Sequence, residues 1–468
     1  MKRYEVYAPC NSKWYKQIPA HWKLTRIKDL VYKNDAGAWG TDPEIGNSIV
    51  CLRVADMDFN LGAFKNKTFS NLTQRSYTSD QVAKLMLEQG DILIEKSGGG
   101  ERMPVGRSVV FDKDYPAVFS NFMQRLRFKP TFINYRLAVY LLRTMYYSGA
   151  SWYYVKQTTG IQNLDLNSML SQERFPVPPR DEQDQIVRYL DWQVSKINRL
   201  IAAKRKQIEL LKEHKEAFIN TAVTRGIVGD IPLKESGMQW LPKVPAHWKT
   251  VPAKALFRNI SELRHEDDPM LAATQKYGLI EQAEYMRREN RRIVLANDNL
   301  DKWLHVEPND FIISLRSFQG GLEKCDKPGC VTWHYVVLRP QQYVYSPFYK
   351  WFFKSASYIG ALQKTSDFIR DGQDLRFSNF AKVGLFVIPM AEQVKIADRL
   401  DSEIPKYQKA IDTLEKEIQQ IIEYRIRLIS DVVTGQIDVR GVEVPDFIYT
   451  EDTDSKQMDE AEEYMGVK

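Results

Sequence analysis

Two stretches of the chain read almost alike: FPVPPRDEQDQIVRYLD at residues 175–191 and FVIPMAEQVKIADRLD at residues 386–401. In both, a phenylalanine and a proline precede a Glu-Gln pair, and an isoleucine and a Leu-Asp pair follow it at the same spacing. A long internal period of this kind indicates a duplicated structural unit. We therefore expect the chain to contain one kind of unit twice.

Shorter motifs repeat in the same order and support the duplication. IPAHWK at 18–23 returns as VPAHWK at 244–249, so each unit would begin with the same Pro-Ala-His-Trp-Lys motif. The other repeats are GDILI at 90–94 with NDFII at 309–313, and TAVTRGI at 221–227 with DVVTGQI at 431–437. We interpret Trp22 and Trp248 as plugs at the edge of a core. A catalytic histidine is disfavoured, because no repeated carboxylate or nucleophile stands beside it in the sequence.

Each Glu-Gln pair is followed by apolar residues at spacings that alternate between four and three, which is the pattern of a coiled-coil seam. The predicted seam residues are Leu190, Val194, Ile197, Ile201, Ile208, Leu211 and Phe218 in the first copy, and Leu400, Ile404, Tyr407, Ile411, Leu414, Ile418, Ile421 and Leu428 in the second. Pro405 lies inside the second pattern, where proline disfavours a regular helix, so we expect that helix to break or begin there.

The predicted fold is α+β: two α/β domains joined by two long antiparallel coiled-coil helices, an internal duplication with pseudo-two-fold symmetry. The expected segments are a first domain at 1–178, a first helix at 179–228, a second domain at 229–389, a second helix at 390–440 and an acidic, disordered tail at 441–468.

Composition limits the class of protein. The 468 residues are 43% hydrophobic and 27% charged, which is typical of globular proteins. No stretch has the length and apolarity of a membrane span, and the N-terminus lacks an apolar signal core, so we expect a cytoplasmic protein without membrane contact. The four cysteines are too scattered for a disulfide framework. The net charge of +6 permits an anionic partner.

Motifs for catalysis are incomplete in this sequence. The stretch from Gly100 to Ser108 has one residue too many for a phosphate-binding loop, with arginine in place of lysine. The Asn/Asp-Pro-Pro-aromatic motif of an adenine methyltransferase is missing. Cys325, Cys330 and His334 lack the fourth ligand of a zinc site. We therefore predict no catalytic residue and no metal ligand.

Taken together, the repeated motifs resemble those of the DNA-specificity subunits of type I restriction–modification systems. The resemblance covers about residues 1–440, in the order of that family. It rests on Pro19 and Trp22, Pro245 and Trp248, Gly90-Asp91-Ile92-Leu93, the segment from Phe175 to Pro179, Glu182-Gln183 with Gln185-Ile186, Pro389, Glu392-Gln393 and Ile396. The second copy departs in minor ways, with Pro389-Met390 where the first has Pro178-Pro179, and Asn309-Asp310 where the first has Gly90-Asp91.

The resemblance implies two target-recognition domains, each reading one half of a bipartite sequence in double-stranded DNA. The helices would set the gap between the halves and dock two methyltransferase subunits, which restriction subunits would join. The chain itself would hold no cofactor and catalyse nothing. S-adenosylmethionine would belong to the methyltransferase subunits, and ATP and magnesium to the restriction subunits. The alternative is a coiled-coil scaffold or adaptor that binds proteins and no DNA.

Base contacts in the two domains are expected at two stations each, where basic, amide and hydroxyl side chains that can read base edges or hold phosphates gather near glycines. The candidates are Lys96, Ser97, Arg102, Arg107, Lys156, Gln157, Thr158 and Thr159 in the first domain, and Arg316, Ser317, Gln319, Lys364, Arg370 and Gln373 in the second. The aromatic clusters at 152–154 and 349–353 are expected to be core rather than base-stacking surface.

Overall fold

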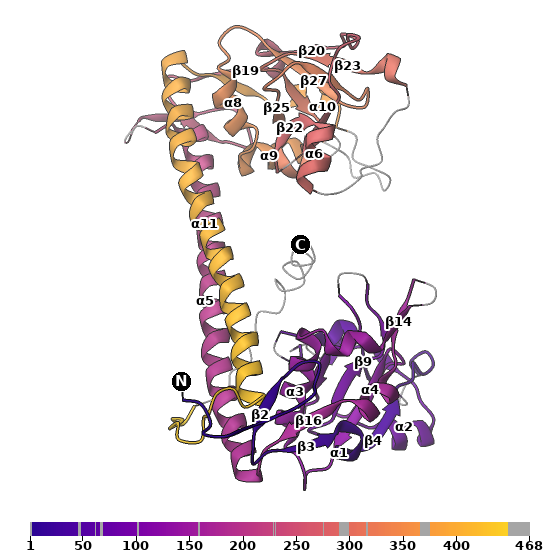
Figure 1. Cartoon of the computed structure of the whole chain (residues 1–468). Helices are drawn as coiled ribbons and strands as arrows, with labels where there is room; N and C mark the ends of the chain where they lie inside the picture. Colours follow the sequence, from indigo (N-terminus) through magenta and orange to yellow (C-terminus); the bar gives the residue numbers. More distant parts are fainter. Residues whose placement is uncertain are drawn as a thin grey trace. The chain divides into compact units, whose positions relative to one another are not determined.

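The computed structural model forms two compact units, Met1–Lys206 with Glu415–Lys468 and Gln207–Leu414 (Figure 1). Each unit holds one α+β domain, the first part of the long helix that follows this domain, and the last part of the other long helix. The structure describes residues 2–44, 48–60, 62–65, 69–100, 103–157, 160–227, 229, 231–274, 276–289, 299–314, 317–365 and 375–447.

The secondary structure of the first unit combines short strands with short helices. Its strands are β1 (Tyr7–Pro9), β2 (Gln17–Pro19), β3 (Lys23–Arg26), β4 (Val31–Ala36), β5 (Ile49–Leu52), β6 (Met57–Asp58), β7 (Ala63–Phe64), β8 (Gln74–Arg75), β9 (Ile92–Glu95), β10 (Ser97–Gly98), β11 (Ser108–Val110), β12 (Ala117–Phe119), β13 (Met123–Phe128), β14 (Val155–Gln157), β15 (Gln162–Leu164) and β16 (Arg174–Val177). Its shorter helices are α1 (Ile27–Leu30), α2 (Ser79–Leu85), α3 (Tyr135–Tyr147) and α4 (Leu166–Gln172).

The second unit has the same kind of composition. Its strands are β17 (Leu233–Glu235), β18 (Lys243–Pro245), β19 (Lys249–Val251), β20 (Phe257–Ile260), β21 (Leu271–Thr274), β22 (Gly278–Glu281), β23 (Leu304–Val306), β24 (Phe311–Ile313), β25 (Glu323–Lys324), β26 (Gly329–Val331), β27 (Val336–Pro340) and β28 (Leu385–Val387). Its shorter helices are α6 (Gln282–Glu289), α7 (Ser317–Gly320), α8 (Ser346–Phe352), α9 (Ala356–Gln363) and α10 (Phe377–Lys382).

Both domains are built on a four-stranded antiparallel sheet with the same strand order. The order is β11-β9-β13-β4 in the first domain and β25-β24-β27-β20 in the second, and equivalent strands occupy equivalent places along the chain. The strand after each tryptophan motif also pairs with the strand before each long helix, β3 with β16 and β19 with β28. The α+β class and the internal duplication are therefore confirmed.

A buried ion pair explains the repeated aspartate of the GDILI and NDFII motifs. Asp91 is fully buried beside β9, and its carboxylate accepts hydrogen bonds of 2.5 and 2.7 Å from the guanidinium of Arg127 on β13. Asp310 beside β24 accepts bonds of 3.1 and 2.9 Å from Arg339 on β27. A charge buried in a sheet must be paired, so aspartate and arginine recur together across the two central strands.

The repeated tryptophan reaches the start of the long helix that follows its own domain. Glu182 accepts a bond of 3.0 Å from the indole nitrogen of Trp22, and its second oxygen lies 2.8 Å from the imidazole of His21. Glu392 has the same two partners in the second unit, Trp248 at 3.2 Å and His247 at 2.7 Å. Trp22 is 5% exposed and Trp248 is 0% exposed, so the prediction that they plug the core edge is confirmed.

One part of that sequence argument was wrong, because a repeated carboxylate does lie beside each histidine. It comes from about 145 to 161 residues further along the chain, so the local sequence could not reveal it. The arrangement is a structural lock: the carboxylate satisfies an indole N–H that would otherwise be buried without a partner.

The glutamine of each Glu-Gln pair completes this lock. The side-chain nitrogen of Gln183 donates to the backbone carbonyls of Phe132 and Pro178, and its oxygen accepts the backbone N–H of Asn134. Gln393 makes the same three bonds to Tyr343, Ile388 and Tyr345. Each glutamine thus ties the start of a long helix to two other segments of its own domain.

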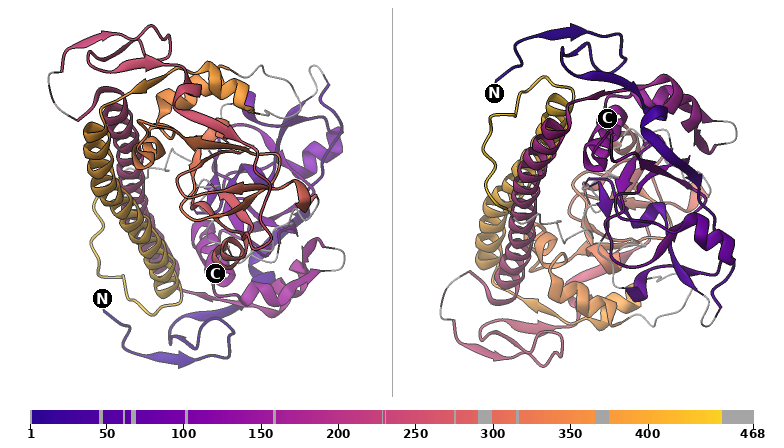
Figure 2. Two further views of the ribbon diagram at one scale, coloured as in Figure 1. Left: turned by 90° about the horizontal axis from the view of Figure 1, so that it is seen from above. Right: turned by 90° about the horizontal axis from the view of Figure 1, so that it is seen from below.

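The long helices are α5 (Arg180–Arg225) and α11 (Met390–Val433), which lie side by side within each unit (Figures 1 and 2). In the first unit Asn198 contacts Arg425 and Lys204 contacts Glu417, so later residues of α5 meet earlier residues of α11. The helices are therefore antiparallel there. In the second unit His214 contacts Tyr407, and Gly226 lies next to Glu392, which gives the same direction.

Most residues of the predicted seam are buried. Among the seam residues only Leu211, Phe218, Tyr407, Leu414 and Ile421 are partly exposed, and the others are buried. The expectation for Pro405 was wrong, because α11 continues through it. Pro405 is exposed, so its ring points away from the seam, and seam packing on both sides offsets the lost backbone hydrogen bond. No helix in the described part of the chain has the length and apolarity needed to cross a membrane.

A polar pair interrupts the seam in the first unit. Arg425 is 3% exposed, and its guanidinium donates a bond of 2.6 Å to the side-chain oxygen of Asn198, which is also 3% exposed. Burial, together with the positive charge of Arg143, lowers the pKa of Arg425 to about 10. A buried polar pair of this kind specifies helix register at some cost in stability.

We expect Glu392→Ala to destabilise the protein by about 1–3 kcal/mol, because the buried indole N–H of Trp248 loses its acceptor. Chemical denaturation monitored by tryptophan fluorescence measures this loss. Glu415→Ala, on an exposed position of the same helix, is the matched control and should leave the midpoint unchanged. Equal effects of the two substitutions would contradict the role of Glu392 as the acceptor for Trp248.

The register pair gives a second expectation. Asn198→Ala should destabilise the protein by about 1.5–3 kcal/mol, because Arg425 stays buried and charged without its hydrogen-bond acceptor. The double change of Asn198 and Arg425 to leucine should recover this loss, since the pair then leaves no buried polar group without a partner. Urea denaturation of the three chains tests both statements, and a double variant less stable than Asn198→Ala would refute them.

Candidate nucleic-acid interface

The two stations predicted in the first domain meet in one small sheet. β10, which follows the GDILI strand, and β14, which follows the aromatic cluster, both pair with β15 in the order β10-β15-β14. Ser97 and Lys156 both lie directly opposite Asn163. Cross-strand partners point to the same face of a sheet, so these three side chains form a row, which we call the polar row.

In the polar row Asn163 and Lys156 are exposed and Ser97 is partly exposed, and all three side chains are hydrogen-bonded to neighbours. The hydroxyl of Ser97 lies 2.6 Å from the side-chain oxygen of Asn163. The side chain of Lys156 is 70% exposed, and its ammonium donates a 2.6 Å bond to Asp165. That hydrogen bond lowers the pKa of the Asp165 carboxyl. Gln157, next to Lys156, is exposed as well. Such a row of donors and acceptors can bind phosphates or base edges.

Alternation along β15 builds this surface. Gln162 and Leu164 are buried, whereas Asn163 between them is exposed. Gln162 donates to the carbonyl of Gly100 and accepts the backbone N–H of Val105, so it holds the glycine-rich loop against the sheet. Sequence reasoning missed Asn163, although an exposed amide between two buried residues is the signal that strand alternation offers. The candidates Arg102, Thr158 and Thr159 lie outside the described residues.

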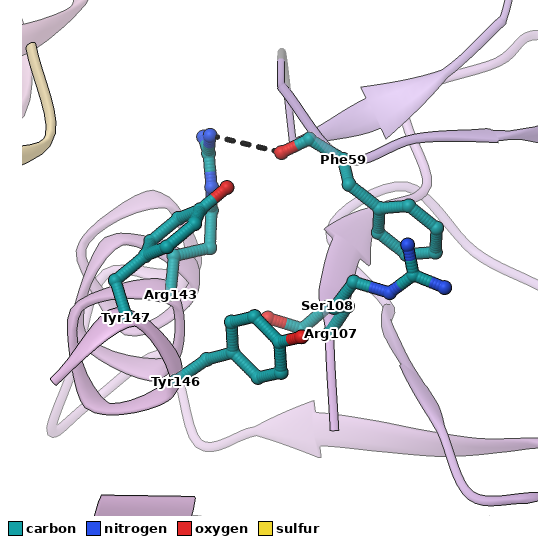
Figure 3. A pocket seen from close by; sticks show the side chains of 6 residues that line it. All are labelled: Phe59, Arg107, Ser108, Arg143, Tyr146 and Tyr147. Carbon is teal, nitrogen blue, oxygen red and sulfur yellow. Dashed lines mark hydrogen bonds between the residues drawn. The ribbon is translucent and has the colours of Figure 1, made fainter. Parts of the chain in front are cut away.

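The guanidinium of Arg107 is held by neighbouring side chains of its own domain. Its guanidinium makes bonds of 2.9 and 3.1 Å with Glu95 and lies 3.7 Å from the ring centroid of Phe59. Figure 3 shows it against that ring, at the edge of a small pocket also lined by Arg143 and Tyr146. Burial raises the pKa of the Glu95 carboxyl, and Arg107 opposes this rise. The predicted contact of Arg107 with DNA stays a prediction. The pairing of its guanidinium with Glu95 disfavours this contact.

Lys96 is partly exposed, and its backbone N–H donates to the carbonyl of Phe122. Its side chain places a positive charge next to Ser97 in the sequence. The predicted contact of Lys96 with DNA stays a prediction.

The aromatic cluster before β14 differs from its prediction. Tyr154 is 7% exposed and donates to Glu173, as a core residue does. Trp152 and Tyr153, however, are 47% and 75% exposed, so their assignment to the core was wrong. They lie in a 3-10 turn, Ala150–Tyr154, where successive side chains point in different directions, and only part of the cluster can face the core. The second cluster was predicted better, since Tyr349, Phe352 and Phe353 are buried.

The stations of the second domain also approach each other, because α7 packs against α9. Ser317 begins α7, is 1% exposed, and accepts the backbone N–H of Ser314 at 2.8 Å, so the structure uses it within the loop. Lys364 caps the end of α9 and is exposed. Arg316, Arg370 and Gln373 lie outside the described residues, as does the side chain of Gln319.

Part of the chain matches a known protein family, and most of the chain is similar to a known relative. Residues 59–210 match the family described as the type I restriction modification DNA specificity domain. Over 447 residues the chain is 22% identical to the putative type I restriction enzyme MjaX specificity subunit of Methanocaldococcus jannaschii, covering 91% of this chain and 95% of that protein.

Comparison with solved structures shows a shared fold in one case with a TM-score above 0.5. A chain from a study of complex assembly and conformational transition of the type I R-M system aligns with a TM-score of 0.60 at 15% identity, covering 90% of this chain and 100% of that one. The HsdS subunit from Thermoanaerobacter tengcongensis aligns with a TM-score of 0.45 at 14% identity, covering 90% of this chain and 99% of that subunit.

Residues 59–210 are thus a DNA-specificity domain, and they contain the polar row and the first part of α5. Over most of its length the chain is also similar to a putative type I restriction enzyme specificity subunit.

The surroundings of Arg107 generate a prediction about stability. Arg107→Gln should destabilise the protein by about 3–5 kcal/mol near neutral pH, because Glu95 stays buried and loses its counter-charge. The raised pKa of Glu95 means that acid neutralises this carboxyl, so the loss should shrink as pH falls. Thermal unfolding at several pH values measures both effects.

The double variant Glu95→Gln with Arg107→Gln serves as the control, because it removes both charges and should recover most of the stability. If Arg107→Gln weakened DNA binding but left unfolding unchanged at all pH values, the structural assignment would be wrong.

Proposed function

We propose that each domain reads one half of a split sequence in double-stranded DNA, and that α5 and α11 set the number of base pairs between the halves. The observation that carries the proposal is the repeated construction of the two units. Both have the same central sheet order and the same lock of glutamate, tryptophan and histidine onto a long helix. Two reading domains held in the same way on one helix pair can present two different surfaces to one duplex.

In the first domain the proposed reading surface is the polar row. Gln157 is exposed next to it, but it lies opposite the buried Gln162 and points to the other face of the sheet. Asparagine and glutamine side chains can make two hydrogen bonds to adenine, and lysine can bind guanine or phosphate. The exposed rings of Trp152 and Tyr153 lie in the turn before β14, and we propose that they extend this surface with apolar contacts. In the second domain the proposed surface includes Lys364.

The proposed partners follow from the family. Two methyltransferase subunits would dock on the helix pair and carry S-adenosylmethionine, and restriction subunits with ATP and magnesium would join them. The chain would select the site and catalyse no step. This division of labour is consistent with the sequence, whose cofactor and phosphate-binding motifs are incomplete.

The test is co-expression of the chain with its methyltransferase subunits, followed by a genome-wide map of modified adenines. One motif with two specific parts around a fixed, unspecified gap is the expected result. A stable complex that modifies no site, together with no salt-dependent DNA affinity, would favour the scaffold reading instead.

Substitutions in the polar row should change only one half of the motif. We expect Asn163→Ala with Ser97→Ala to relax or abolish the half read by the first domain, with a loss of about 1–3 kcal/mol for each direct base contact, and to leave the other half intact. Lys156→Gln should lower the salt dependence of binding by about one phosphate contact.

Lys28→Gln is the matched control, because Lys28 is exposed on α1 of the same unit and lies outside the polar row. Its motif and salt dependence should equal those of the unchanged chain. Loss of both halves in the Asn163 variant, with normal folding, would refute the assignment of this sheet to one half-site.

A further inference from the structure

A group of histidine and carboxylate side chains lies in the second unit, away from the predicted stations. It joins the loop between β20 and β21 to strand β23. Two backbone hydrogen bonds of 2.8 Å hold these segments together, from His305 to the carbonyl of Glu262 and from Arg264 to that of Trp303. The backbone therefore holds the two segments that carry these side chains next to each other.

Three potential ligand atoms converge on one point. One atom each from Glu262, His265 and His305 lie within 4.8 Å of one another, the one such group of three or more residues among those that the structure describes. The two imidazole rings face each other with centroids 4.0 Å apart, and an oxygen of Glu262 lies 3.3 Å from Nε2 of His265. Glu307 adds an oxygen 3.2 Å from Nε2 of His305.

Supporting contacts orient two of these side chains. The Asp268 carboxylate lies 2.8 Å from Nδ1 of His305 and also accepts the backbone N–H of His265 at 2.7 Å. Both Asp268 and His305 have side chains less than 10% exposed. Arg339 donates to the second oxygen of Glu262 at 3.4 Å. A carboxylate on the far nitrogen of a histidine is the usual support of a metal-binding imidazole, because it leaves the lone pair of Nε2 directed at the ion.

We propose that Glu262, His265 and His305 bind one divalent transition-metal ion of the zinc type, with the carboxylate of Glu307 at the fourth position. A tetrahedral zinc ion with bonds of about 2.1 Å separates neighbouring ligand atoms by about 3.4 Å. The distances of 3.3 and 3.2 Å already have this size. The ligand atoms lie within 4.8 Å of one another, so the largest separation needs to shrink by at most about 1.4 Å. The side chain of His265 is 59% exposed, which leaves room for this movement.

Charge and ligand chemistry select the class of ion. Glu262, Asp268 and Glu307 bring three carboxylates, whereas Arg339 is shared with Asp310. The site is therefore negative and favours a cation. Imidazole with carboxylate suits zinc and its neighbours, whereas magnesium and calcium prefer oxygen alone. The ion would clamp the β20–β21 loop to β23 and would be independent of the polar row in the other unit.

The cluster also explains why the sequence reading found no metal site. Its residues come from two segments with irregular spacing, whereas that reading considered Cys325, Cys330 and His334. Both cysteines are buried, burial raises the pKa of each thiol, and His334 is exposed and stacks on Trp333. The structure thus separates the residues that sequence spacing had brought together.

The test uses the full chain, stripped of metal with a chelator and titrated with zinc chloride in a calorimeter. We expect one equivalent of tight binding and a rise in the melting temperature on zinc addition. His265→Ala and Glu262→Gln should remove this binding event. Asp268→Asn, which changes only the supporting contact, should weaken affinity about 10–100-fold.

Controls separate this site from other sources of binding. His334→Ala should bind zinc like the unchanged chain, since its imidazole lies outside the cluster. Circular dichroism checks that each variant is folded, and His265 is exposed enough for its removal to be tolerated. Stoichiometric binding that survives His265→Ala but is lost on changing Cys325 and Cys330 to serine would overturn the proposal. Absence of binding to the folded, stripped chain would leave only a network of ion pairs and would overturn it equally.

Discussion

The architecture depends on one requirement: the indole nitrogen of a buried tryptophan needs an acceptor. In each unit that acceptor is a carboxylate in the first turn of a long helix, Glu182 for Trp22 and Glu392 for Trp248. A carboxylate is also favoured there by the partial positive charge of a helix N-terminus. The same oxygen pair reaches the neighbouring histidine, so one side chain joins the start of a domain, its end and the helix that carries it.

This arrangement explains which residues repeat and which do not. The repeated residues are those that make the lock, the glutamine bonds and the buried Asp–Arg pair of the central sheet. They hold a domain on its helix whatever its outer loops contain. The peripheral elements differ, since the first domain has the β10-β15-β14 sheet where the corresponding station of the second has the short helices α7 and α9. A common frame can therefore carry two different binding surfaces.

The sequence predicted those parts of the structure that follow a regular spacing of residues or an internal repeat. The alternating three and four spacing gave the seam residues correctly, and the repeated motifs gave the duplication. Contacts between distant segments were beyond such reasoning, as the Glu182–His21 pair shows. Pro405 was misjudged because helix propensity is local, whereas seam packing on both sides is not. Trp152 and Tyr153 were misjudged because composition does not say which way a short turn points its side chains. The residues of the Glu262–His305 cluster come from two segments at irregular spacing, so no sequence pattern identifies them.

The alternation along β15 has a consequence for how such a protein can change over time. Gln162 and Leu164 support the loop and the core, whereas Asn163 between them contributes little to either. Drift at the exposed position is therefore nearly free of folding cost, while its two neighbours are constrained. With the reading role proposed for the polar row, a lineage would explore new DNA preferences one residue at a time on this strand, with its scaffold intact at every step.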